Sequence, residues 1–141
     1  MLVRLMYTSR SNTGMDEQEL ASILRQSRPT NTAEGITGML VFSDQLFIQV
    51  LEGGRSEVNR LYNRICADKR HTDIELLYFE EITQRRFAGW SMGQVNMARV
   101  NTALLLKYSE KPQLNPYAVS GKITMALFEE LVSSASVIGE R

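Results

Sequence analysis

Residues 37–54 read TGMLVFSDQLFIQVLEGG, and this stretch decides the fold. It predicts a β-hairpin in which residues 37–42 form one strand, residues 43–45 the turn and residues 46–51 the second strand. The second strand is apolar on both faces except at Gln49. We therefore expect it to lie in the centre of a sheet that is covered on both sides.

Strand and helix patterns alternate on both sides of this hairpin. The order strand–helix–strand–strand–helix–strand is that of an α+β ferredoxin-like sandwich, a mostly antiparallel sheet with two helices on one face. One additional strand near residue 90 gives a five-stranded sheet. The predicted strands are residues 2–7, 37–42, 46–51, 74–79 and 90–95, the last at an edge of the sheet, and the first helix is residues 16–27.

Single residues predict where the two helices begin and end. Pro29 ends the first helix because it lacks an N–H donor, which leaves Asn31 in the loop that follows. Ser56 caps the second helix. The apolar stripe of that helix includes Cys66, so we expect the thiol to be buried and inert. His71 falls in a charged turn and is expected in solvent.

Two further amphipathic helices are predicted at residues 101–108 and 122–134, the second with Ile123, Leu127 and Leu131 in one row. The sheet face opposite the first two helices is also apolar in the hairpin and needs a cover. We interpret the C-terminal helices as a cap over this face or as a surface for a partner.

The composition excludes several classes of function. A chain of 141 residues suits one compact core, and its 16 basic and 16 acidic residues leave no net charge. This balance argues against a nucleic-acid or anionic-membrane partner. One cysteine and one histidine argue against a disulfide and a metal site. The absence of a signal peptide and of a long apolar run predicts a reducing, cytoplasmic location.

Two polar residues stand out in the predicted core. Gln49 is an amide within an apolar strand, and a buried amide without a partner costs about 1–3 kcal/mol. Strand alternation places Gln49 on the face of Phe47 and Leu51, while Tyr7 ends the first strand. Because the first and third strands are neighbours in a ferredoxin-like sheet, Tyr7 and Gln49 can meet beneath the two helices. A hydrogen bond that only stabilises the core would account for both residues.

Four sequence blocks resemble the BLUF family, which senses blue light with a non-covalently bound flavin, usually FAD. They are RLMYTS at residues 4–9, NTAEGITG at 31–38, FIQVLEG at 47–53 and WSMG at 90–93. All four stand in the family's order and spacing. The resemblance implies a ferredoxin-like fold, FAD as cofactor with FMN as the alternative, a sensor domain over residues 1–98 and a helical cap or output segment over residues 99–141.

The resemblance also implies a photoactive switch. Tyr7 would give an electron and a proton to the excited flavin, and Gln49 would be the amide that rearranges between that phenol and the flavin edge. An amide carries both donor and acceptor groups, so its rearrangement changes hydrogen bonds without changing net charge. Trp90 and Met92, on one face of the last predicted strand, resemble the pair that can exchange places beside the amide. Which of the two lies inward stays open.

Four more residues would complete the cofactor site by resemblance. Asn31 would bond the pyrimidine edge of the flavin, Ile23 would pack against its rings, and Arg64 and Asp68 would contact the ribityl–phosphate side. The residues alone allow simpler interpretations. Asn31 is then a turn residue, Ile23 a core residue, and Arg64 and Asp68 an i,i+4 surface ion pair.

The resulting expectation is a blue-light sensor and not an enzyme. Its output would pass to a separate effector protein, such as a cyclic-nucleotide or cyclic-di-GMP enzyme, or through a homo-oligomer. Two alternatives stay open. One is a small hydrolase similar to acylphosphatases, in which Arg10 and Asn12 would frame an anion. The other is an interaction module that has lost its flavin.

Overall fold

Strand β3 (Leu46–Gly54) lies inside a six-stranded sheet, as its two apolar faces predict. The computed structural model describes residues 1–134 and 137–138, and its strand order is β4-β1-β3-β2-β5-β6. Every pairing is antiparallel except that of β2 with β5. The other strands are β1 (Leu2–Ser11), β2 (Thr37–Ser43), β4 (His71–Ile82), β5 (Gly93–Val95) and β6 (Val137–Ile138).

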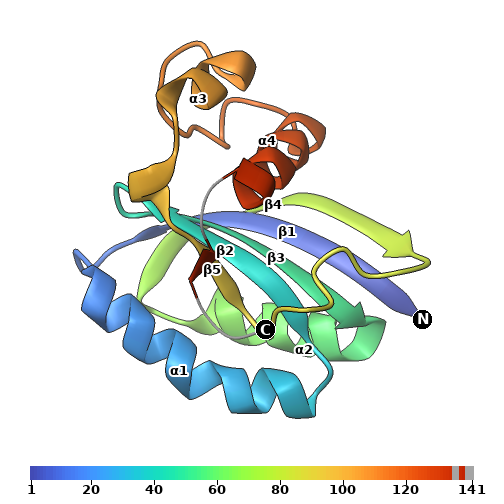
Figure 1. Cartoon of the computed structure of the whole chain (residues 1–141). Coiled ribbons are helices and arrows are strands. Elements are labelled where there is room, and N and C mark those ends of the chain that lie inside the picture. The colour runs from blue at the N-terminus through green and yellow to red at the C-terminus, as the bar shows by residue number, and fades with distance from the viewer. Residues whose placement is uncertain (135–136, 139–141) are drawn as a thin grey trace.

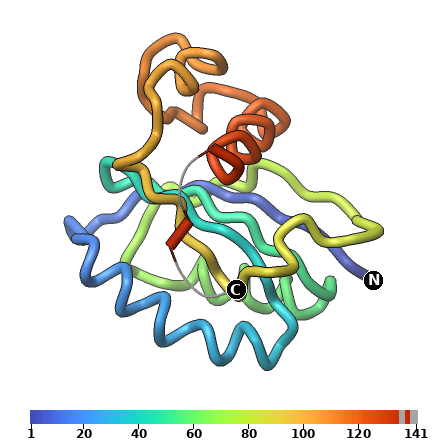
Figure 2. Tube along the Cα trace, viewed as in Figure 1, coloured from blue at the N-terminus to red at the C-terminus, as the bar shows by residue number. Residues whose placement is uncertain are grey.

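Helices cover both faces of the sheet (Figure 1). One face carries α1 (Glu17–Ala33) and α2 (Arg55–Ala67), and the other carries α3 (Thr102–Tyr108) and α4 (Gly121–Ser134). The predicted α+β ferredoxin-like sandwich with C-terminal helices is therefore confirmed, with the two-residue β6 as an additional strand. After β5 the chain passes through a short 3-10 helix (Met97–Arg99) to the second face (Figure 2).

Each face of the sheet has its own hydrophobic core. The first-face core lies under α1 and α2 and includes Leu5, Leu20, Phe47, Leu51 and Met92. The second-face core lies under α3 and α4 and includes Met6, Val41, Ile48, Leu127 and Phe128. The C-terminal helices thus cap the second face, as one of the two interpretations of the tail proposed. The domain boundary at residue 98 remains a prediction.

The hairpin formed by β2 and β3 is closed by a two-residue turn. Ser43 pairs with Leu46, and the residues between them, Asp44 and Gln45, have φ values of 52° and 64°. Two successive positive φ angles are typical of the type I′ turn that matches the twist of antiparallel strands. The loop is therefore one residue shorter than the predicted 43–45.

Helix α1 does not end at Pro29, so this prediction was wrong. The helix continues to Ala33 with Pro29 inside it, and its buried side chains Leu20, Leu24 and Asn31 extend past the proline. Burial of this stripe outweighs the missing backbone hydrogen bond. The helix ends instead before Gly35, whose φ of 71° is the left-handed conformation common after helix ends. Asn31 therefore lies in the last helical turn and not in a loop.

Helix α2 also differs from its prediction at both ends. Strand β3 runs directly into the helix, so Gly54 is the N-cap residue and no side chain caps it; Ser56 lies inside the helix. The thiol of Cys66 is exposed, because the buried stripe stops one residue earlier, at the half-buried Ile65. Cys66 is therefore not a core residue.

Strands β1, β4 and β5 differ in length from their predictions. β1 continues to Ser11 because its end still pairs with both β3 and β4, and β4 begins at His71 for the same reason. β5 begins only at Gly93, so Trp90 and Met92 precede it and do not share a strand face. Nor is β5 an edge strand, because β6 pairs with its outer side.

On the second face, α4 packs closely against β4. Gly121 begins the helix, and a Cβ at this position would overlap the carbonyl oxygen of Leu77. Leu127 and Leu131 are buried as predicted, but Ile123 is 41% exposed, since the buried face of α4 is centred on Phe128. No helix in the described part of the chain is long and apolar enough to cross a bilayer.

Candidate functional site

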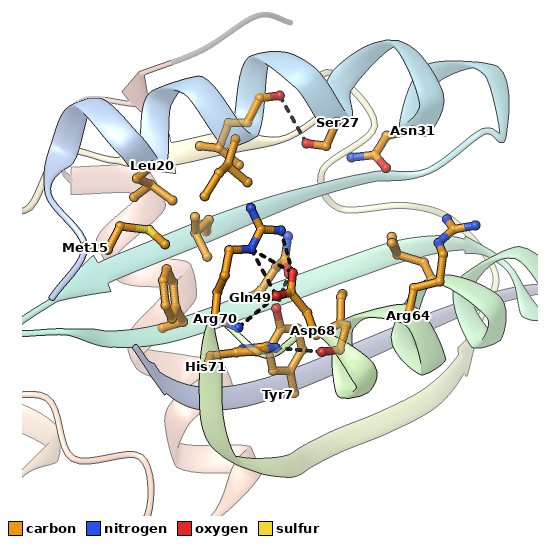
Figure 3. Close-up of a pocket in the computed structure, with 16 residues that line it drawn as sticks. Tyr7, Met15, Leu20, Ser27, Asn31, Gln49, Arg64, Asp68, Arg70 and His71 are labelled. Atoms are coloured by element: carbon orange, nitrogen blue, oxygen red, sulfur yellow. Dashed lines mark hydrogen bonds and ion pairs between the residues drawn. The ribbon is translucent and has the colours of Figure 1, made fainter. Parts of the chain in front are cut away.

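A cavity of about 240 Å³ lies between α1, α2 and the first face of the sheet (Figure 3). Its surface is mostly apolar, and polar side chains reach it from the sheet, from both helices and from the segment after α2. The residues that line it are Tyr7, Met15, Leu20, Ile23, Leu24, Ser27, Asn31, Leu40, Phe47, Gln49, Leu61, Arg64, Ile65, Asp68, Arg70 and His71. All six residues predicted to bind the cofactor are among them.

Tyr7 and Gln49 meet at the floor of the cavity, as the sequence predicts. They are directly paired in the register of β1 and β3. The Tyr7 hydroxyl donates to Gln49 Oε1 at 2.5 Å. Tyr7 is 4% exposed, and this burial is the main cause that raises the pKa of its phenol. The phenol therefore keeps its proton and acts as a hydrogen-bond donor to the amide.

Met92 occupies the other side of the Gln49 amide. Gln49 Nε2 donates to Met92 Sδ at 3.3 Å, and a thioether is a weak acceptor. Met92 is 1% exposed and belongs to the first-face core, whereas Trp90 packs against the second-face core. The bend of the chain before β5 thus sends the two side chains to opposite faces. The residue beside Gln49 in this structure is Met92.

Asn31 reaches the cavity from the last turn of α1. Its side chain is buried, with 5% of the residue exposed, and it makes no hydrogen bond to any residue that the structure describes. Its amide atoms are not among the fully buried, unpartnered atoms of the described residues, so they open onto the cavity. Asn31 is therefore available to a bound ligand. Ile23 lines the same cavity two turns earlier on α1, where its aliphatic side chain can pack against a ring.

Arg64 and Asp68 line the cavity without pairing with each other. Arg64 lies 3.3 Å from Glu34, while Asp68 accepts hydrogen bonds from the backbone and guanidinium of Arg70 at 2.5–3.0 Å. The bond from Arg70 is the main cause that lowers the pKa of Asp68 to about 2. The two arginine side chains are 54% and 52% exposed, so both cations lie at the mouth of the cavity.

Arg70 and His71 line the cavity, although no sequence pattern singled them out as binding residues. His71 is not in solvent: Nε2 donates to the Ile65 carbonyl at 2.6 Å, and Nδ1 lies 2.8 Å from Ser9 Oγ. Its ring also meets the ring of Tyr7 edge-on, with centroids 6.5 Å apart. His71 reaches the site through the pairing of β4 with β1, which the short predicted strands did not include, and Arg70 directly precedes β4.

The residues proposed for a hydrolase do not form an anion site. Arg10 pairs with Asp73 at 3.7 Å and lies over the ring of Tyr117. The Asn12 amide donates to the carbonyl of Lys69. Neither residue lines the cavity. Within residues 1–134 and 137–138, no group of three His, Cys, Asp or Glu side chains could hold a metal ion.

The chemistry of the cavity fits a flavin nucleotide. Aliphatic side chains from α1 and α2 form the walls that a flat ring system needs. Gln49 and Asn31 offer amide donors and acceptors for a polar ring edge. Arg64 and Arg70, although each is paired with a carboxylate, place guanidinium donors at the mouth of the cavity, where they could contact a phosphorylated tail. Tyr7 adds an oxidisable phenol next to one of the amides.

Residues 2–93 match the BLUF family, described as sensors of blue light using FAD. The match covers well over half of the 141 residues, and the chain belongs to this family. It is therefore a blue-light sensor that uses a flavin. Members of the family bind FAD or FMN, and one solved structure, that of Klebsiella pneumoniae BlrP1, contains FMN together with cyclic diGMP.

Curated relatives match a similar length of the chain. The β subunit of the Euglena gracilis photoactivated adenylate cyclase is 34% identical over 92 residues, which are 64% of this chain and 11% of that protein. The blue light- and temperature-regulated antirepressor BluF of Escherichia coli K12 is 31% identical over 87 residues, 62% of this chain and 22% of that protein. The chain thus spans less than a quarter of the length of these two relatives.

Solved structures match nearly the whole chain. The photo-activated state of BlsA has a TM-score of 0.82 and 32% identity, covering 96% of this chain and 99% of that one. The BLUF protein BlrB in its dark state has a TM-score of 0.74 and 33% identity, covering 94% and 95%. BlrP1 has a TM-score of 0.68 and 25% identity, covering 96% and 31%. The C-terminal helices therefore belong to an arrangement that BlsA and BlrB share.

Proposed function

We propose that Tyr7, Gln49 and Met92 form a light-operated hydrogen-bond switch whose state is passed to the C-terminal helices and from there to a partner protein. The observation that carries this proposal is the continuous contact from the Tyr7 hydroxyl through both ends of the Gln49 amide to the Met92 sulfur. A change in the orientation of one amide would alter contacts on both of its sides.

The photochemical step leaves no net redox change in the protein. When bound, the flavin would supply an electron acceptor that blue light excites. Tyr7 would give up one electron and one proton, because its phenol is oxidisable and its proton already points at Gln49 Oε1. One electron and one proton would then return to Tyr7. Gln49 remains in a rotated or tautomeric form, which is allowed because an amide can exchange donor and acceptor without changing charge.

The rearranged amide would weaken the contact with Met92. In the structure, Gln49 Nε2 donates to the sulfur. If the amide rotates, its oxygen faces the sulfur, and two acceptors cannot form a hydrogen bond. Met92 is followed directly by β5, which pairs with β2 on one side and β6 on the other. Movement of Met92 would therefore reach the segment that leads to the second face.

The cofactor would be held by the residues that the family resemblance implies. Asn31 bonds the ring edge, Ile23 packs on the ring, and Arg64 contacts the ribityl–phosphate side. Asp68 acts mainly through Arg70, since its carboxylate is already occupied by that guanidinium.

The output partner is proposed from the relatives. The Euglena relative is named as a photoactivated adenylate cyclase subunit, the Escherichia coli relative as an antirepressor, and the BlrP1 structure contains cyclic diGMP. An effector protein, such as a cyclic-nucleotide or cyclic-di-GMP enzyme, is consistent with all of this, as is a homo-oligomer that transmits the signal. A cytoplasmic location rests on the sequence composition.

The visible absorption spectrum before and after blue light tests the switch. We expect flavin absorption that shifts slightly to the red in light and recovers in the dark. Tyr7→Phe and Gln49→Leu should keep the flavin and lose the shift, because they remove the hydroxyl or the amide at nearly constant volume. Tyr62→Phe is a control whose ring lies 5.7 Å from that of Tyr7, and it should keep the shift. A Tyr7→Phe protein that still shifts would contradict the proposal.

A further inference from the structure

Arg28, on α1, is hydrogen-bonded to the backbone of Met92. Its Nε and Nη2 atoms lie 3.2 and 3.0 Å from the Met92 carbonyl oxygen. Within the described residues, no carboxylate lies within ion-pair distance of this guanidinium, so two of its donors are directed at one neutral acceptor. Hydrogen bonds from a charged donor are stronger than those between neutral groups.

Other contacts hold the backbone on both sides of Met92. On one side of it, the Trp90 carbonyl accepts from the Gly38 amide at 3.0 Å; on the other, β5 begins at Gly93. A second contact with α1, from Gln94 Nε2 to Glu17 Oε2 at 3.2 Å, lies two residues further along β5. Arg28 is thus the side chain that fixes the backbone of Met92 itself.

Arg28 also lies on the helix that forms one wall of the cavity. Asn31, with its unpaired amide, follows it by three residues on the same helix. Arg28 does not line the cavity. One helix therefore offers a side chain to the ligand and another to the backbone of the residue that contacts Gln49.

We propose that Arg28 is a positioning residue that holds Met92 against Gln49 in the dark and links this contact to α1. The proposal rests on the proposed switch only where it concerns the light cycle. In the dark, Arg28 stabilises the arrangement in which the Met92 sulfur accepts from Gln49 Nε2. If light displaces Met92, the bonds from Arg28 are broken or strained, and they favour the return.

Arg28→Ala tests this role and has a matched control. Arg25 lies almost one turn earlier on α1, is exposed and makes no side-chain hydrogen bond or ion pair to a described residue, so Arg25→Ala removes the same charge without the contact. The first readout is the methyl resonance of Met92 in the dark, in flavin-loaded protein with 13C-labelled methionine methyl groups, assigned with Met92→Leu.

In Arg28→Ala we expect the Met92 resonance to broaden or to move toward that of a mobile methionine. Arg25→Ala should leave it in place, and Arg28→Lys should restore it in part, because an ammonium offers a point contact in place of two fixed donors. Arg28→Met, which keeps an apolar stem, replaces the alanine variant if that one is unstable. An unchanged Met92 resonance in Arg28→Ala or Arg28→Met overturns the proposal.

The second readout is the rate of dark recovery. Loss of charge-assisted bonds from a half-buried side chain should slow recovery by roughly three- to tenfold. Recovery at the wild-type rate would overturn the link to the light cycle. If the wild-type protein shows no light-induced shift at all, the proposed switch fails, while the dark resonance of Met92 still decides whether Arg28 positions it.

Discussion

The amides of Gln49 and Asn31 differ in the hydrogen-bond partners that the protein provides for them. Gln49 is bonded on one side by Tyr7 and contacts Met92 on the other, so it can report a change at either end. Asn31 is buried and has no hydrogen-bond partner for its side chain within the described residues. The first amide suits a switch, and the second suits a fixed bond to a ligand.

Removal of the Asn31 amide should weaken flavin binding. One neutral hydrogen bond contributes about 0.5–1.5 kcal/mol, so Asn31→Ala is expected to raise the flavin Kd roughly two- to tenfold. Asn63→Ala, at an exposed position of α2 that does not line the cavity, is the control. Titration of flavin-depleted protein, followed by flavin fluorescence, measures both. An unchanged Kd in Asn31→Ala would exclude this residue from the binding site.

Asp68 should make a pH-dependent contribution to stability. Arg70 lowers the pKa of its carboxyl to about 2 from a usual value of 3.8. The folded state therefore favours the charged form, and this contribution is complete above about pH 5 and is lost as the pH falls through 2. We expect Asp68→Asn to lower the free energy of unfolding at pH 7, and the difference from wild type to shrink below pH 4.

Urea unfolding of the two proteins at pH 7, 5 and 3 measures this difference. An equal gap at pH 7 and pH 3 would show that the bond between Asp68 and Arg70 does not control the ionisation of Asp68.

Helix α4 is held to β4 by a close backbone approach at Gly121. A methyl group there would overlap the Leu77 carbonyl oxygen, which is backbone and cannot turn aside. Gly121→Ala should therefore displace the start of the helix and cost about 1–3 kcal/mol in the free energy of unfolding. Gly89→Ala, where a methyl group meets nothing within 4 Å, should cost far less. Equal stability of the two variants in urea would contradict this account of the packing.

Strand pattern predicted more of the structure than single boundary residues did. The alternation in β1 and β3 placed Tyr7 and Gln49 on one face, and the register pairs them directly. The helix end predicted at Pro29 was wrong, because burial of side chains on both sides of the proline stabilises α1 as far as Ala33. His71 and Arg70 were missed because the pairing of β4 with β1 is a long-range contact that short-range pattern does not encode.

The side-chain directions in the segment before β5 could not be predicted from local pattern either, because they too depend on long-range contacts. Alternation assigned Trp90 and Met92 to one face, but the chain bends there and sends them to different cores. Their positions depend on contacts with distant residues, such as that from Gly38 N to the Trp90 carbonyl.

The whole molecule consists of one sheet between two separate cores. The cavity lies in the first-face core, and the C-terminal helices complete the second. Phe128 is 1% exposed at the centre of the second core, where its ring meets that of Phe87 edge-on at 6.1 Å. A signal that reaches a partner through α3 or α4 must cross the sheet or pass around it through β5.

Damage to the second core should affect stability before it affects photochemistry. Phe128→Ala is expected to lower the free energy of unfolding by about 3–5 kcal/mol through cavity formation. The folded fraction should keep its flavin and its light-induced shift, since Phe128 is remote from the cavity lining. Urea unfolding and light-minus-dark absorbance check the two parts. A folded variant without the shift would show that the two faces are not separable in this way.

The central claim is that the Gln49 amide changes its hydrogen bonds in light. Light-minus-dark infrared difference spectra of protein with and without 13C-labelled glutamine side chains measure this change directly. We predict an isotope-sensitive amide carbonyl band that appears in the wild-type protein, is lost in Gln49→Leu and persists in Gln45→Leu. A difference spectrum without an isotope-sensitive glutamine band, or one that is unchanged in Gln49→Leu, would contradict the account.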